Sequence, residues 1–138
     1  MDGSPVPLLL LSLGLCCTRI HGHRSEVYPT LHSSSTRPLQ VGQRLELECK
    51  SPIEDSGVFW IHQDKGGNLQ FIVFISHLSQ PKFVGNVKTS ARFEVKKHGR
   101  LYSLVVKSFK QQDEGNYVCL ILRDRALYFS RHLPVFFP

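Results

Sequence analysis

The sequence lacks the residue patterns that catalysis and metal binding require. It has seven histidines but no Cys-x-x-Cys or His-Glu-x-x-His spacing, no Gly-x-Ser-x-Gly turn and no glycine-rich phosphate-binding loop. These absences argue against an enzyme and predict neither a metal nor a cofactor. No N-linked glycan is expected either, since Asn68, Asn86 and Asn116 all lack a hydroxyl residue two positions later.

No apolar run is long enough to span a bilayer. Near the N-terminus, residues 6–17 (VPLLLLSLGLCC) form an apolar block that is too short for a membrane helix, and polar residues follow it. Such a block is typical of a secretory signal peptide. We therefore expect residues 1–22 to be removed, with cleavage near Gly22, and residues 23–138 to form one domain.

Cysteine is scarce in the predicted mature chain. The sequence has four cysteines, and Cys16 and Cys17 lie in the predicted signal peptide. Only Cys49 and Cys119 remain, an even pair in an oxidising compartment, so we expect a disulfide between them. Closing this long loop would stabilise the fold by roughly 4 kcal/mol if the effect is the chain entropy of the unfolded state.

Basic residues exceed acidic residues. Lys and Arg number 17 against 11 Asp and Glu, and removal of Asp2 and Arg19 leaves 16 against 10, the same net charge of +6. A basic surface favours acidic partners but does not identify them. The bases are spread along the chain, which argues against nucleic-acid binding. The one cluster, Lys96 to Arg100, is either a solvated turn between strands or a contact for heparan sulfate or anionic lipid.

The two remaining cysteines bracket Trp60, and Tyr117 stands two residues before Cys119. This pattern resembles an immunoglobulin variable-type (V-set) domain, an all-β fold in which two antiparallel sheets are joined by one disulfide. The resemblance implies that Trp60 packs on the disulfide and that Tyr117 fixes a corner of the fold. It also places Arg92 and Asp113 where such domains carry a salt bridge; the alternative is a plain surface pair.

Alternating apolar and polar residues predict the strands. An irregular first strand is expected within residues 27–39 and a polar loop at residues 51–57, with Phe109 closing one end of the core. The other predicted strands cover residues 44–49, 58–63, 69–75, 91–95, 101–106, 117–122 and 127–137.

The strands at 58–63 and 69–75 are apolar on the face away from Trp60. This face is expected to carry Phe59, Ile61, Phe71, Phe74 and Gln63. An exposed apolar patch of this size usually marks a protein interface, although a loop of the same chain could cover it. A glutamine amide both donates and accepts, so Gln63 suits a two-fold axis. We expect a homodimer or pairing with a close relative.

The C-terminal segment points to a narrower family. Residues 127–138 (LYFSRHLPVFFP), together with 71–76 (FIVFIS) and Trp60-x-x-Gln63, resemble the V-set domain of the class I MHC coreceptor alpha chains of T cells. The Phe-Gly-x-Gly sequence that ends antibody and T-cell-receptor domains is replaced here by residues 128–132 (YFSRH). The resemblance therefore argues against a rearranged antigen receptor.

This resemblance implies a type I membrane protein at the plasma membrane, reached through the secretory pathway. In that family the domain homodimerises or pairs with a beta chain, and it binds the membrane-proximal domain of class I MHC. A cytoplasmic tail recruits a Src-family kinase. The sequence contains no stalk, membrane helix or tail, so we expect a signal peptide plus an ectodomain head, which alone would be secreted.

The family's ligand contacts can be carried over by position onto two loops. These contacts are Phe74, Ser76, His77 and Lys82 in one loop and Arg123, Asp124, Arg125 and Ala126 in the other. Leu31 stands where the family has an arginine. The two arginines suit carboxylate recognition, although each could instead pair with Asp124 or a neighbouring chain. An adhesion or inhibitory receptor with another ligand is the alternative function.

Overall fold

The computed structural model describes residues 27–35, 40–83 and 91–138. The predicted signal peptide at residues 1–22 lies outside them and stays a prediction. Within the described ranges, no helix is long and apolar enough to cross a membrane.

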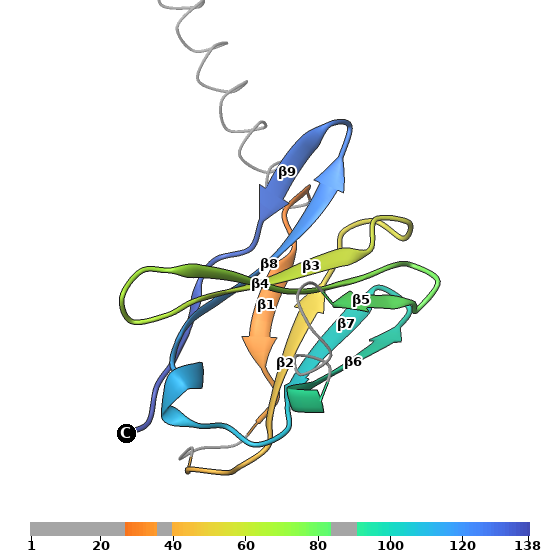
Figure 1. Ribbon diagram of the computed structural model, residues 1–138. Helices are drawn as coiled ribbons and strands as arrows, with labels where there is room; N and C mark the ends of the chain where they lie inside the picture. The colour runs from red at the N-terminus through yellow and green to blue at the C-terminus, as the bar shows by residue number, and fades with distance from the viewer. Residues whose placement is uncertain (1–26, 36–39, 84–90) are drawn as a thin grey trace, which may run out of the picture.

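Two antiparallel sheets form the domain, as predicted (Figure 1). One has the order β1 (Thr30–Ser33), β2 (Leu45–Lys50), β7 (Leu101–Val106), β6 (Phe93–His98). The other has the order β10 (Leu133–Val135), β8 (Gly115–Arg123), β3 (Val58–Gln63), β4 (Leu69–Ile75), β5 (Pro81–Phe83), and β9 (Ala126–Phe129) also pairs with β8. A single turn of 3-10 helix, η1, covers Gln111–Asp113.

The core lies between the sheets and is built from alternate residues of their strands. The Cys49–Cys119 disulfide joins β2 to β8, with the two Cα atoms 6.4 Å apart, which confirms the predicted bridge. Trp60 pairs with Cys119 in register and is fully buried. Burying a side chain of this size removes a large apolar area from water and stabilises the fold by several kcal/mol, on the order of 25 cal/mol per Å².

The corner before β8 is organised around Asp113. Its carboxylate pairs with Arg92 and accepts a hydrogen bond from the Lys110 backbone N–H at 2.9 Å. Its carbonyl oxygen accepts a hydrogen bond from the Tyr117 hydroxyl at 2.6 Å. Burial, reinforced by the Asp113 charge, raises the pKa of Tyr117, so its hydroxyl remains protonated and able to donate. Both the predicted salt bridge and the predicted tyrosine corner are confirmed.

Gly115 begins β8 because no other residue fits there. Its φ is 140°, and a Cβ on it would lie 2.1 Å from the carbonyl oxygen of Gln63 and 2.8 Å from Nε2 of His62. The close approach of β3 and β8 at this point therefore requires a glycine.

The structure corrects the predicted turn at Lys96 to Arg100. Lys96, Lys97 and His98 all belong to β6, and only Gly99 and Arg100 form the turn to β7. Gly99 has a φ of 61°, a conformation that glycine adopts without strain, so two residues suffice to reverse the chain. The sequence prediction placed the start of the turn too early because charged residues were read as loop.

The predicted last strand is divided. The prediction of one strand over residues 127–137 is wrong, because β9 ends at Phe129 and β10 begins at Leu133. At the break, the Ser130 N–H donates to the carbonyl oxygen of Cys119 at 2.8 Å, and Ser130 Oγ accepts from the Cys119 N–H at 3.0 Å. The Ser130 hydroxyl thus accepts the Cys119 N–H hydrogen bond in place of a backbone carbonyl of a paired strand. The short strand β5 was not predicted.

Two buried tyrosines provide a matched test of the corner. Tyr117→Phe should destabilise the domain by about 1–3 kcal/mol, because it leaves the buried Asp113 carbonyl without its donor. The Tyr102 hydroxyl is buried near the Gly57 backbone but makes no hydrogen bond of ordinary geometry. Tyr102→Phe should therefore change the stability by less than about 0.5 kcal/mol. Urea unfolding measures both; equal losses would contradict the special role of Tyr117.

Candidate functional site

A β-bulge brings two phenylalanines of β4 to the same face. Trp60 pairs with Val73 but Ile61 pairs with Phe71, so Ile72 is an extra residue in β4. Ile72 and Val73 are both buried. Strict alternation would place Phe71 and Phe74 on opposite faces, since they are three residues apart. The bulge gives both of them the outward orientation that was predicted.

These rings form a cluster on the outer face of the six-stranded sheet. The Phe59 ring lies 4.4 Å from the Phe74 ring and 5.8 Å from the Phe71 ring, between centroids. Ile61 lies beside Phe71 in the register. All four side chains are half-buried, because they cover one another and still face outward.

The apolar surface continues across β8 and β9, which sequence reasoning missed. Phe59 pairs with Leu120, and Leu120 pairs with Phe129. Beyond them Leu122 pairs with Leu127. Leu122, Leu127 and Phe129 are 49%, 54% and 47% exposed. Alternation along β8 could have revealed these residues, since Tyr117, Cys119 and Ile121 point inward. We call the whole set the apolar face. Its members are Phe59, Ile61, Phe71, Phe74, Leu120, Leu122, Leu127 and Phe129.

Gln63 lies where the apolar face meets the β3–β4 turn. Its amide makes only long hydrogen bonds of 3.5 Å, accepting from Asn116 Nδ2 and donating to the carbonyl oxygen of Gly67. Leu69, opposite it on β4, is largely exposed. The amide therefore remains available to a partner seated on this face.

Three loops meet at one end of the sandwich, which we call the loop end. The register places residues 51–57, 76–80 and 124–125 together there, because β3 begins where β4 and β8 end. In the first loop, Ser51 Oγ donates to the carbonyl oxygen of Ile53 at 2.7 Å and lies 2.9 Å from Ser56 Oγ. These bonds give the loop a defined shape before any partner binds.

The second loop is built around Ser76. Ser76 Oγ accepts hydrogen bonds from the backbone N–H groups of Leu78 and Gln80 at 3.3 and 3.2 Å. These two bonds stabilise the turn. The hydroxyl of Ser76, a predicted ligand contact, is therefore used within the loop. Leu78, at the tip, is 71% exposed and was missed by sequence reasoning. Of the other predicted contacts in this loop, His77 and Lys82 are exposed and Phe74 is half-buried in the apolar face.

The third loop is a tight hairpin that projects from the sandwich (Figure 1). Asp124 and Arg125 have φ values of 51° and 65°, as a type I′ turn requires. Arg123 Nε lies 3.7 Å from Asp124 Oδ2, which is the internal pairing considered as an alternative. Arg125 has no ion-pair partner among the described residues and is exposed. Ala126 starts β9 and is half-buried.

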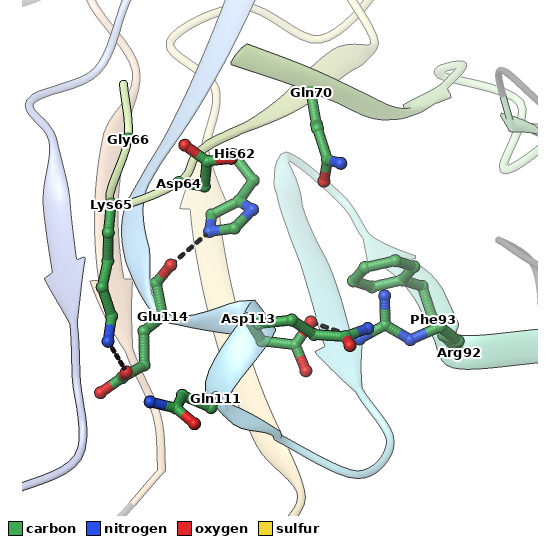
Figure 2. A pocket seen from close by; sticks show the side chains of 11 residues that line it. His62, Asp64, Lys65, Gly66, Gln70, Arg92, Phe93, Gln111, Asp113 and Glu114 are labelled. Carbon is green, nitrogen blue, oxygen red and sulfur yellow. Dashed lines mark hydrogen bonds and ion pairs between the residues drawn. The ribbon is translucent and has the colours of Figure 1, made fainter. Parts of the chain in front are cut away.

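A cleft of about 670 Å³ lies at the opposite end (Figure 2). His62 is buried beside it, stacks on Tyr117 and donates from Nε2 to the carbonyl oxygen of Glu114 at 2.9 Å. Lys65 Nζ lies 2.6 Å from Glu114 Oε1. Figure 2 shows two ion pairs that line the cleft, Lys65 with Glu114 and Arg92 with Asp113. They hold the corner together and are not arranged for catalysis.

The part of the chain that the structure describes contains no cluster of side chains suited to bind a metal ion. No three side chains of the His, Cys, Asp or Glu type converge there to hold an ion. The candidate functional site is therefore the apolar face together with the loop end.

Comparisons with known proteins agree with this picture. Residues 32–136 match the family model for the immunoglobulin V-set domain. The T-cell surface glycoprotein CD8 alpha chain of Rattus norvegicus is 26% identical over 99 residues, which are 70% of this chain and 42% of that protein. The chain thus spans less than half of that relative's length. The crystal structure of the swine CD8αα homodimer superimposes with a TM-score of 0.68 at 23% identity, covering 78% of this chain and 97% of that one.

Glu114 should make the domain less stable as the pH falls into the acid range. The Lys65 ammonium first, and then the Phe137 N–H, lower the pKa of its carboxyl group. A lowered folded-state pKa means that the stabilisation is complete above the unfolded-state pKa and is lost as the pH falls through the folded-state value. Glu114→Gln should therefore be less stable than wild type at neutral pH, and the gap should close on acidification.

Thermal unfolding between neutral and acid pH measures this gap. Glu54→Gln, in the exposed first loop, is the matched control and should follow the wild-type profile. A gap between wild type and Glu114→Gln that stays constant with pH would contradict the assigned role.

Proposed function

Because the chain belongs to the immunoglobulin V-set family, we propose that it is the head of a T-cell coreceptor that pairs with a second copy and binds class I MHC. Domains of this family bind other proteins and are not enzymes. The similarity to the CD8 alpha chain supports a cell-surface receptor of this type. The observation that carries the proposal is the apolar face, which a monomer would leave in water.

The apolar face supports pairing through the six-stranded sheet. No loop among the described residues covers Leu122, Leu127 or Phe129, which are each about half exposed. The face runs across four neighbouring strands, β4, β3, β8 and β9, as an interface between two sheets requires. A second copy is the simplest occupant, and a coreceptor beta chain is the other.

The loop end supports recognition of an acidic partner loop. Arg125 stands on a two-residue turn of defined backbone conformation and has no acidic partner in the described chain, so no existing ion pair has to be broken when it binds. Leu78, at the tip of the second loop, adds an exposed apolar contact beside His77. Arginine is among the residues that contribute most to the binding energy of protein interfaces.

T-cell activation would depend on parts of the receptor outside this sequence. In the coreceptor family a cytoplasmic tail recruits a Src-family kinase, so the head supplies binding only. Two observations favour an adhesion or inhibitory receptor instead: the acidic first loop with Glu54 and Asp55, and Leu31 in place of the family's arginine.

Pairing is tested by placing a charge on the apolar face. Phe129→Arg should raise the dimer dissociation constant about tenfold or more, because a buried interface would have to accommodate two unpaired charges. Val41→Arg is the matched control, since Val41 is exposed in the turn before β2, away from this sheet. Sedimentation equilibrium measures both. A wild-type chain that stays monomeric at high micromolar concentration would remove this half of the proposal.

Ligand binding is tested by reversing the charge of Arg125. Arg125→Glu should weaken binding to class I MHC of the same species about tenfold or more, without changing dimerisation. Arg131→Glu, exposed between β9 and β10, is the control with the same charge change. Surface plasmon resonance measures the affinities. Unchanged affinity would exclude Arg125 from the site, and an absence of wild-type binding at high micromolar concentration would favour the alternative receptor.

A further inference from the structure

The basic cluster of the sequence lies on the sheet opposite the apolar face. His98 pairs with Leu101, and Leu101 pairs with Lys50, so these residues form one row across β6, β7 and β2. Tyr102 and Cys49, one step along, point into the core. The row of His98, Leu101 and Lys50 therefore points outward to solvent.

Two further basic residues extend this row. Lys96 is two residues before His98 and shares its outward face, and Arg100 lies in the adjoining turn. All four basic side chains are exposed. We call Lys50, Lys96, His98 and Arg100 the basic surface.

The acids of the same sheet face are already occupied. Glu48 lies 2.8 Å from His32 Nε2, while Glu46 and Glu94 lie 3.6 and 3.3 Å from the two terminal nitrogens of Arg44. None of these acids lies within 4.0 Å of a charged nitrogen of Lys50 or Arg100.

Most of the basic surface carries uncompensated charge. Lys96 reaches Glu46 only at 4.0 Å, and Lys50 and Arg100 form no ion pair with any described residue. A polyanion that contacts several of these cations at once would compensate their charge.

We propose that the basic surface binds a sulfated polysaccharide. Two strand spacings separate His98 from Lys50, roughly 10 Å in all, and Lys96 lies one repeat along the strand. A linear polymer with repeated sulfate groups contacts such a row at several points, whereas a single small anion contacts one. This binding goes beyond the proposed coreceptor function.

Other polyanions fit the surface less well. The Cys49–Cys119 disulfide is typical of an oxidising compartment, where nucleic acid is not a usual partner. A membrane surface would be contacted by exposed apolar side chains next to the cations. Here Leu101 is half-buried, and the exposed Leu122, Leu127 and Phe129 lie on the other sheet.

The basic surface stays accessible in the proposed dimer but adjoins the loop end. It lies on the four-stranded sheet, away from the apolar face. Arg100 Nη1 donates to the carbonyl oxygen of Pro52 at 3.1 Å, and the Ser51 N–H donates to the carbonyl oxygen of Arg100 at 2.9 Å. A bound polysaccharide would thus lie beside the first loop.

The test uses the full chain, secreted from cells, on immobilised heparin. The triple variant Lys50→Gln, Lys96→Gln, Arg100→Gln should bind about tenfold or more weakly than wild type, because three charge-assisted contacts are lost. The matched control removes three charges elsewhere, from residues that are exposed and lie off the basic surface: Lys107→Gln, Lys110→Gln, Arg131→Gln. The control should lose no more than about twofold, since it changes only the net charge.

Three results would overturn the proposal. The first is an equal loss of binding in the two triple variants, because that would show an effect of net charge alone. The second is that the wild-type chain does not bind heparin. The third is that it binds phosphatidylserine vesicles but not heparin. Circular dichroism and thermal unfolding check the fold of each variant. If the first variant is less stable, Lys50→Arg, Lys96→Arg, which keeps both charges, must retain wild-type binding.

Discussion

The Cys49–Cys119 disulfide is the constraint on which the rest of the molecule depends. It joins β2 to β8, and β8 lies between β3 on one side and β9 and β10 on the other. The inward residues of β8 are thus held against the core and Trp60. The outward residues of the same strand form part of the apolar face, and its end carries the hairpin with Arg125. This covalent bond therefore anchors the strand that contributes to both the apolar face and the loop end.

Some charged side chains of this domain stabilise its fold, and others remain unpaired on its surface. Asp113 and Glu114 are nearly buried, and they hold the corner through Arg92, Lys65 and the Tyr117 hydroxyl. The acids of the four-stranded sheet pair with Arg44 and His32. The fold thus uses much of its negative charge in internal pairs, which leaves an excess of positive charge on the basic surface.

Only part of the candidate site could be predicted from the sequence. Phe59 and Ile61 follow from alternation, because Trp60 must face the disulfide. Phe71 and Phe74 cannot both follow from alternation, since only the bulge at Ile72 places them on one face. The division of the last strand at Ser130 was likewise invisible, because it depends on hydrogen bonds to Cys119, eleven residues away. The exposed Leu78 required the shape of a loop.

The sequence by itself determined the fold class, the disulfide, the tyrosine corner and the Arg92–Asp113 pair. These features could be expected because residue types at set spacings along the chain resemble the V-set pattern. Only the tertiary structure decided how far the apolar face extends, how the basic residues gather opposite it and which charges remain free. Those properties arise from register between strands far apart in the chain, and register depends on the packing of whole sheets rather than on any short segment.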